Sequence, residues 1–292
     1  KTSASRYIFC ETSEADAGKE LRIELTTHTY NYSGVVNTVL CGDKTDIWLT
    51  ILNQYGPATY IAIFIFFTGL VTILFSLALG MIYHSSFDME YLGWCMIMGG
   101  VWMMGESKLR QILVPNASAL GSLCFVMILL CPIPILLYAD SIQKQLHRRL
   151  YTILGGGLAL LDFAVCSILT FFGIADYMET LPIGQIILCS ILVVVFIHLF
   201  IYMHSSRRKS DRLLLLGLLA SIICISIEAI SVYFVTSISG LFIGIGMIIL
   251  LFVNIIRTLR NLQDMELHRQ KIEVEKSKQQ TERISLQMMQ TL

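Results

Sequence analysis

The chain has 292 residues, of which 55% are hydrophobic and only 14% are charged. Soluble globular domains carry about 25% charged residues, so this composition, with a mean hydropathy of +0.69, excludes an ordinary soluble protein. The formal net charge is +0, so no general attraction to nucleic acid is expected. The composition indicates a membrane protein with several spans.

The first 53 residues are more polar and predict the C-terminal part of an extracytoplasmic β-rich domain. Residues 21–25 (LRIEL) alternate apolar and polar side chains, and residues 35–40 form a second short β-branched run. Cys10 and Cys41 are the only cysteines outside the apolar segments. They form a disulfide in an oxidising compartment or remain two free thiols.

Seven apolar segments follow, and a helix that crosses a bilayer needs about 20 such residues. They predict an all-α, seven-transmembrane bundle over residues 54–258, with Pro132 and Pro134 expected to kink the third span. The expected spans are residues 60–83, 91–106, 117–138, 151–173, 181–202, 213–235 and 241–256.

The distribution of Lys and Arg predicts the orientation of these spans. Basic residues follow the third, fifth and seventh spans, whereas GIADYMETLP and the link near Ser237 have none. Only Lys108 and Arg110 depart from this bias. We therefore expect the N-terminus outside and the C-terminus in the cytoplasm.

Ionisable residues within spans are costly and are functional candidates by default. Asp162 falls near the middle of the fourth span, and Glu228 lies in the outer half of the sixth. Glu106, Lys108 and Arg110 gather at the outer end of the second span and, with Glu228, predict a ligand pocket or a charge latch. In the alternative interpretation, these groups and Asp162 only hold helices together.

The seventh span continues into a polar segment without Pro or Gly, which predicts a single helix that leaves the membrane. Gly240 and Gly244 permit close helix approach, which suits a sliding or rotating span or tight static packing. Arg257 lies at the end of this span, just before the signalling helix or coiled coil expected over residues 259–292. A polar seam with 3-4 spacing predicts a weak parallel homodimer, or else a linker helix. The seam comprises Met265, His268, Ile272, Glu275, Gln279, Glu282, Leu286 and Met289.

No active site is evident in these residues. His84, His198 and His204 lie near cytoplasmic span ends, but no Cys or Asp completes a ligand set at metal spacing. A phosphate-binding glycine loop and a Ser/His/Asp arrangement are also lacking. We expect no cofactor, no metal and no catalytic residue in this part of the protein.

Several stretches together resemble the bacterial seven-transmembrane receptors with diverse intracellular signalling modules. They are SEADAGKELRIEL, NYSGVVNTVLCGDK, WMMGESKLRQ, LVPN, LCPIPILLY and GIADYMETLP. The resemblance implies an extracytoplasmic β-sandwich, a seven-helix sensor in a bacterial plasma membrane and a cytoplasmic output domain. The closing ISLQMMQTL is similar to the segment that precedes HD-type cyclic-dinucleotide phosphodiesterases, although a diguanylate cyclase or a histidine kinase is also compatible.

The sequence thus predicts a transmembrane receptor that senses an extracytoplasmic or membrane-embedded signal. The signal, a small molecule or a peptide, is relayed through Gly240, Gly244, Arg257, Ile272 and Leu286 to an output domain in the same chain. The alternative is a small-solute transporter, or a sensor subunit that acts through a separate protein. A G-protein-coupled receptor is disfavoured, because the third and seventh spans lack the Asp-Arg-Tyr-like and Asn-Pro-x-x-Tyr-like sequences.

Overall fold

The computed structural model describes residues 7–20, 22–24, 39–83, 88–143, 149–205, 209–234 and 240–290. Within these ranges the regular structure is helical and no strand occurs. The elements are η1 (Glu14–Asp16), α1 (Lys44–Tyr83), α2 (Met89–Glu106), α3 (Arg110–Leu113), α4 (Ala117–Leu130), α5 (Pro132–Ile142), η2 (Arg149–Gly155), α6 (Gly156–Phe171), α7 (Tyr177–Ser205), α8 (Lys209–Phe234) and α9 (Leu241–Gln290).

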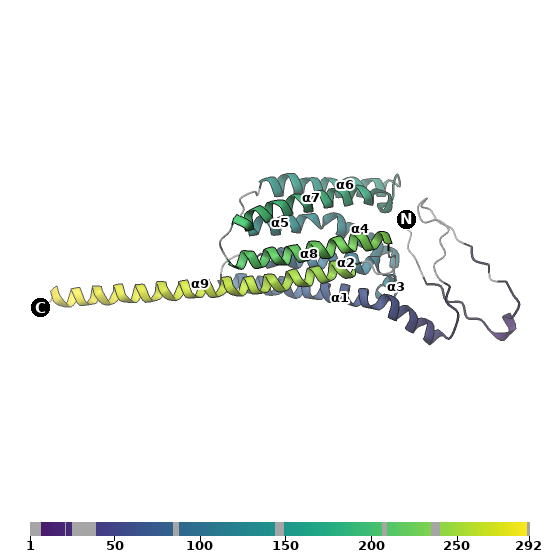
Figure 1. Ribbon diagram of the computed structural model, residues 1–292, viewed down its shortest axis with the longest axis horizontal. Coiled ribbons are helices and arrows are strands. Elements are labelled where there is room, and N and C mark those ends of the chain that lie inside the picture. The colour runs from purple at the N-terminus through teal and green to yellow at the C-terminus, as the bar shows by residue number, and fades with distance from the viewer. Residues whose placement is uncertain are drawn as a thin grey trace.

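The long helices lie side by side in a bundle, and α9 continues far beyond it (Figure 1). We call the end from which α9 projects the rod end, and the opposite end, near the N-terminal segment, the N-terminal end. α2 packs against α1, α4, α5 and α9, and α8 packs mainly against α9. The predicted continuous helix is confirmed, because α9 runs unbroken over 50 residues from Leu241 to Gln290.

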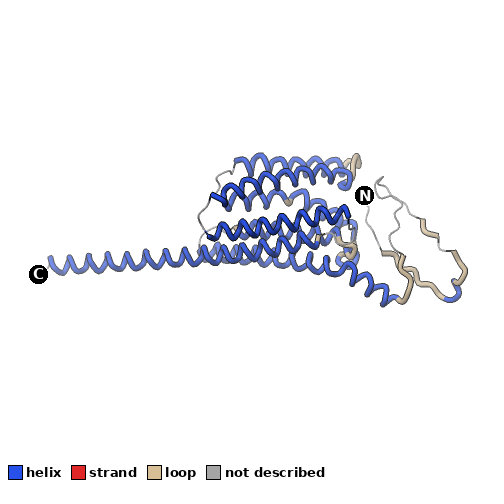
Figure 2. Tube along the Cα trace, viewed as in Figure 1, coloured by secondary structure: helices blue, strands red, loops and turns tan. Residues whose placement is uncertain are grey.

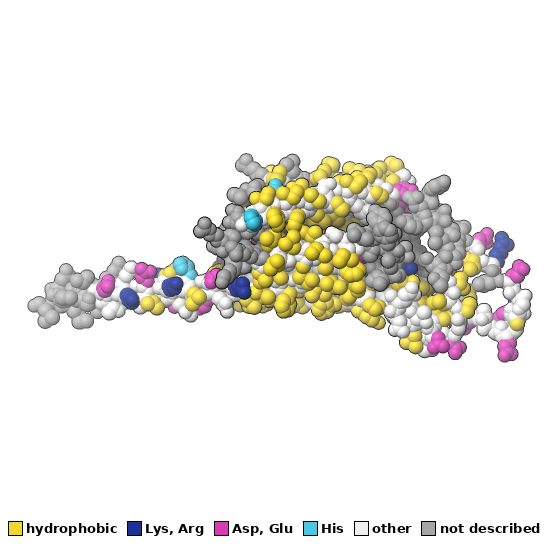
Figure 3. Space-filling view, viewed as in Figure 1, with side chains coloured by type: hydrophobic (Ala, Val, Ile, Leu, Met, Phe, Trp, Pro, Cys, Tyr) yellow, Lys and Arg dark blue, Asp and Glu magenta, His cyan; other side chains and the backbone are white. Residues whose placement is uncertain are grey.

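Five of the described helices are long and apolar enough to cross a membrane. They fall in Lys44–Tyr83, Ala119–Ile142, Leu150–Phe171, Glu179–Tyr202 and Leu241–Glu282, while α8 contributes a shorter apolar stretch, Leu213–Glu228. The face of the bundle seen in Figure 3 is mostly apolar, whereas charged side chains lie on the projecting part of α9 and on the N-terminal segment. Water would solvate such a surface poorly, so the bundle suits a bilayer. The count of seven spans stays a prediction.

Close helix packing depends on small residues. A Cβ atom added to Gly69 of α1 would lie 2.9 Å from the backbone oxygen of Gly93 in α2. The two backbones therefore meet without intervening side chains, as small residues allow between membrane helices. The largest cluster of buried apolar side chains draws on several helices and includes Ala62, Ile65, Leu92, Met96, Met103, Leu136, Ile191, Val195, Leu199 and Leu214.

The third predicted span is interrupted where the prolines stand. α4 ends at Leu130 and α5 begins at Pro132, with Cys131 between them. Proline has no backbone N–H, so Pro132 and Pro134 cannot donate the helical hydrogen bonds that would continue α4. The helix is therefore interrupted at the position where the prolines predict a kink.

The N-terminal segment differs from the prediction (Figure 2). Of the two expected strands, only residues 22–24 and 39–40 lie within the described ranges, and these have no regular structure. α1 begins already at Lys44, inside the stretch assigned to a β-rich domain. Ile47 and Ile51 are four residues apart, and Ile51 is buried, so the apolar spacing of this stretch suits a helix.

The disulfide considered for this segment is not formed. Cys10 and Cys41 are both free and exposed in the structure. The segment instead touches α1 through a ring contact between Phe9 and Trp48, whose centroids are 4.9 Å apart. Apolar docking onto α1 holds this part of the segment in place of a covalent link.

Candidate functional site

The N-terminus of α9 is capped by a carboxylate from the neighbouring helix α8. Glu228 Oε1 accepts a hydrogen bond from the backbone N–H of Gly240 at 2.5 Å, and Oε2 accepts one from Phe242 at 2.9 Å. The first N–H groups of a helix have no partner within that helix, and a negative charge there is stabilised by the helix dipole. We call this contact the cap anchor.

The cap anchor is buried and requires a glycine. Glu228 is only 3% exposed, so its charge depends on these N–H donors rather than on water. Gly240 has a φ of +97°, a left-handed conformation that side chains with a Cβ atom rarely adopt. Two residues that the sequence proposed for different roles, Glu228 and Gly240, therefore act together.

A second contact holds α9 at the rod end. The Arg257 guanidinium lies 2.8 Å from Asp88 Oδ2, with Arg257 11% exposed and Asp88 22% exposed. The Ser141 hydroxyl donates to the other oxygen of Asp88. Asp88 directly precedes α2, and Ser141 belongs to the last turn of α5, so this rod-end anchor joins three helices.

Between the two anchors, α9 packs closely on its neighbours. A Cβ atom added to Gly244 would lie 2.6 Å from Cγ2 of Ile61 and 2.9 Å from Cδ1 of Ile65, both in α1. The Ser221 hydroxyl of α8 donates to the carbonyl of Gly246 at 2.9 Å. These contacts support the packing interpretation of the glycines and place α1 and α8 in direct contact with this part of α9.

Buried polar groups without partners surround the rod-end anchor. Asn254 is 1% exposed, and neither its amide nitrogen nor its amide oxygen has a hydrogen-bond partner among the described residues. The buried Tyr138 hydroxyl and Arg257 Nε are in the same situation within those ranges. Buried polar groups without hydrogen-bond partners raise the free energy of the present arrangement. A small movement that gives them partners recovers that free energy and therefore has a low net cost. This region is therefore suited to more than one arrangement.

The residues of the predicted charge cluster, Glu106, Lys108, Arg110 and Glu228, contact different partners. Lys108 forms no ion pair with the described residues, and its ammonium instead donates to the Tyr55 hydroxyl of α1 at 3.2 Å, with the nitrogen 4.6 Å from the ring centre. Arg110 donates to the carbonyl of Gly105 at 3.2 Å and is close enough to Glu106 for electrostatic interaction. Lys108 is thus held by an aromatic partner in α1, and a single latch formed by all four residues stays a prediction.

The N-terminal segment contacts the same end of the bundle. The backbone N–H of Tyr7 donates to Gln111 Oε1 at 2.9 Å, just after α2. Burial raises the pKa of the Tyr7 phenol, and the Tyr55 phenol nearby raises it further. The segment, the Lys108 region and α1 are thus in contact, so a change in the segment can reach the bundle directly.

Asp162 has a structural environment. It is 8% exposed and accepts a weak hydrogen bond from the Cys166 thiol at 3.6 Å, one turn later in α6. A Cβ atom added to Gly184 of α7 would lie 3.1 Å from Asp162 Oδ2. These contacts place Asp162 between α6 and α7, away from both anchors of α9.

The projecting part of α9 carries the remaining candidates. Side chains from residue 263 to 282 are exposed, Ile272 being 40% exposed, and Arg269 forms an i,i+4 ion pair with Glu273 at 3.8 Å. The side chain of Leu286 lies outside the described residues, although the helix continues through this position. The described side chains of the seam up to Glu282 are therefore open to solvent.

Sequence reasoning missed Asp88 and Ser141. Asp88 directly precedes an apolar helix, and Asp is common at that position, so the sequence could have indicated that α2 begins there. Its pairing with Arg257, 169 residues away, depends on how three helix ends meet. No family model, curated protein or solved structure matches this chain. The site must therefore be interpreted from its own geometry.

Proposed function

We propose that this chain is the membrane part of a signal-transducing receptor, in which α9 carries a conformational change out of the bilayer to an output domain. The main observation behind this proposal is that the two halves of α9 have different surroundings. One half is held at both ends by the cap anchor and the rod-end anchor, and the other half is exposed. A helix transmits displacement along its axis because its backbone hydrogen bonds keep it rigid.

The mechanism is a two-state equilibrium of the bundle. In one state both anchors are formed, and in the other at least one is broken and α9 is shifted or rotated. A signal at the N-terminal end acts through the contact of Tyr7 with Gln111 of α3 and through that of Lys108 with Tyr55 of α1. It changes the equilibrium only to the extent that it binds the two states with different affinity.

The proposal includes the orientation of the chain in the membrane and the number of its spans. Basic residues at the rod end support a cytoplasmic location for it, with seven spans and the N-terminal segment outside. The exposed seam supports pairing of two copies in parallel. The resemblance seen in the sequence supports an output domain of cyclic-dinucleotide metabolism beyond Leu292.

Disulfide cross-linking in native membranes tests the relay. Single cysteines are placed along the exposed half of α9 at positions 263 to 276, in a background in which the exposed Cys10, Cys41 and Cys189 are changed to Ser. We expect cross-linking between copies to be strongest at positions three and four residues apart. In Glu228→Gln and Asp88→Asn, the strongest positions should move by one or more residues, because α9 is rotated.

Ile227→Ala, which alters an outward-facing neighbour of Glu228, is the matched control and should leave the pattern unchanged. The same cross-linking maxima in all variants would show that the anchors do not set the position of the rod and would refute the relay. Cross-linking without any periodicity would refute the paired helix.

A further inference from the structure

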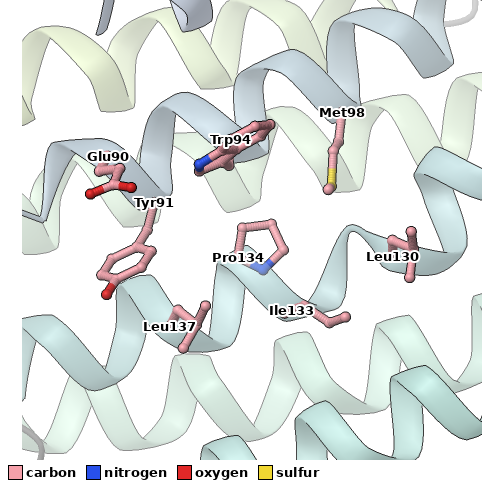
Figure 4. A pocket seen from close by; sticks show the side chains of 8 residues that line it. All are labelled: Glu90, Tyr91, Trp94, Met98, Leu130, Ile133, Pro134 and Leu137. Atoms are coloured by element: carbon pink, nitrogen blue, oxygen red, sulfur yellow. The ribbon is translucent and has the colours of Figure 1, made fainter. Parts of the chain in front are cut away.

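A cavity of about 210 Å³ lies between α2 and the broken third span (Figure 4). Seven of its eight lining side chains carry no charge, and most are apolar. α2 contributes Glu90, Tyr91, Trp94 and Met98, and α4 and α5 contribute Leu130, Ile133, Pro134 and Leu137.

The break in the third span produces this cavity. The chain passes from α4 to α5 at Cys131, and Pro134 of the following turn faces the cavity. Trp94 is 44% exposed, so the cavity opens on the apolar outer surface of the bundle. In a membrane that opening faces lipid chains and not water.

One carboxylate stands at the edge of this apolar space. Glu90 is half-buried and lies beside Tyr91 at the rod end of the cavity (Figure 4). Among the described residues Glu90 has no hydrogen-bond or ion-pair partner. A carboxylate near the bilayer interface is stabilised by a cationic partner, and the aromatic rings of Tyr91 and Trp94 suit the same depth.

We propose that this cavity binds one chain of a phospholipid whose primary ammonium headgroup pairs with Glu90. The apolar walls suit the acyl chain, and the single negative charge suits an ammonium group with N–H donors. A trimethylammonium headgroup has no N–H donor and pairs less well, and an anionic headgroup is repelled.

The location of the cavity connects it to α9. Asp88 of the rod-end anchor stands two residues before Glu90, and Ser141 lies one turn after Leu137. A lipid that separates α2 from α5 therefore alters the contact between Asp88 and Ser141, and so the hold on Arg257. This regulatory consequence rests on the proposed relay, whereas lipid binding does not.

Fluorescence quenching by brominated lipids tests the site. The purified chain is placed in nanodiscs of phosphatidylcholine that contain increasing amounts of bromine-labelled phosphatidylethanolamine, phosphatidylcholine or phosphatidylglycerol. The signal of Trp94 is obtained by subtracting that of Trp94→Phe. We expect half-maximal quenching at about tenfold less phosphatidylethanolamine than phosphatidylcholine, the ratio given by one charge-assisted hydrogen bond.

Glu90→Gln should abolish the preference, and Glu266→Gln, on the exposed half of α9, should retain it. Equal quenching of Trp94 by the three lipids in the unchanged chain, which means ordinary surrounding lipid, would overturn the proposal. A preference for phosphatidylglycerol would do the same, and neither result depends on a substitution at Glu90.

The same nanodiscs distinguish the site from its role in signalling. If the Trp94 preference is found but the rod cross-linking pattern is identical in the three lipids, the link to the rod-end anchor is overturned and the lipid site stands. If the lipids shift the pattern without any Trp94 preference, the relay stands and the site is overturned.

Discussion

The two halves of α9 are one helix held by different forces. From Leu241 to about residue 262 most side chains are buried or half-buried, and the helix is fixed by Glu228, by Asp88 and by packing on α1 and α8. From residue 263 to 282 the side chains are exposed, and the helix depends on its own propensity and on local pairs such as Arg269 with Glu273.

This difference shows how one rigid helix can be positioned by tertiary contacts along one half while its other half remains exposed. Tertiary contacts set the position of the covered half, and the exposed half follows because the backbone is continuous. Changes in the covered half should therefore affect stability strongly and move the exposed half. Changes in the exposed half should remain local.

Removal of the cap anchor should have the largest effect. Glu228→Ala leaves the buried N–H groups of Gly240 and Phe242 without their acceptor, and hydrogen bonds to charged groups contribute about 1.5 to 3 kcal/mol each. We expect the free energy of unfolding in mixed micelles to fall by about 3 to 5 kcal/mol. Hydrogen exchange at the start of α9 should accelerate. Unchanged exchange there would contradict the cap.

Disruption of the rod-end anchor should have a smaller effect, because it is partly exposed. Asp88→Asn leaves Arg257 without its ion-pair partner, and we expect a loss of about 2 kcal/mol in the same unfolding measurement. The double variant with Arg257→Gln should lose less than the sum of the two single variants. Strict additivity would show that the two side chains do not interact.

The addition of one methyl group where α9 approaches α1 should lower the stability of the bundle. Gly244→Ala places its Cβ atom 2.6 Å from Cγ2 of Ile61, so we expect a loss of about 1 to 2 kcal/mol from overpacking. Gly157→Ala, in α6, meets nothing within 4 Å and should be neutral or stabilising by up to about 1 kcal/mol. Equal effects on thermal unfolding would mean that α9 does not approach α1 closely.

The exposed half should show the smallest effect. Gln279→Gly lowers helix propensity by about 1 kcal/mol at an exposed position, so amides near it should exchange faster. Thermal unfolding of the bundle should not change. A lower unfolding temperature would show that the exposed half contributes to the stability of the bundle.

The sequence predicted the course of α9 better than it predicted the residues that α9 contacts. Its start at Leu241, its continuity into the polar segment and the break at Pro132 follow from local patterns and are confirmed. The N-terminal prediction was less successful, because the polar residues around Ile47 and Ile51 concealed a helical spacing that continues into α1.

The sequence by itself determined a helical chain with long apolar segments. It singled out Glu228 because a charge within a bilayer is costly, and Arg257 because it follows the last apolar segment. Only the tertiary structure decided their partners, since Glu228 reaches the start of α9 and Arg257 reaches Asp88. The physical reason is that hydropathy and helix propensity are properties of neighbouring residues. The partner of a buried charge depends on the register and packing of helices far apart in the chain.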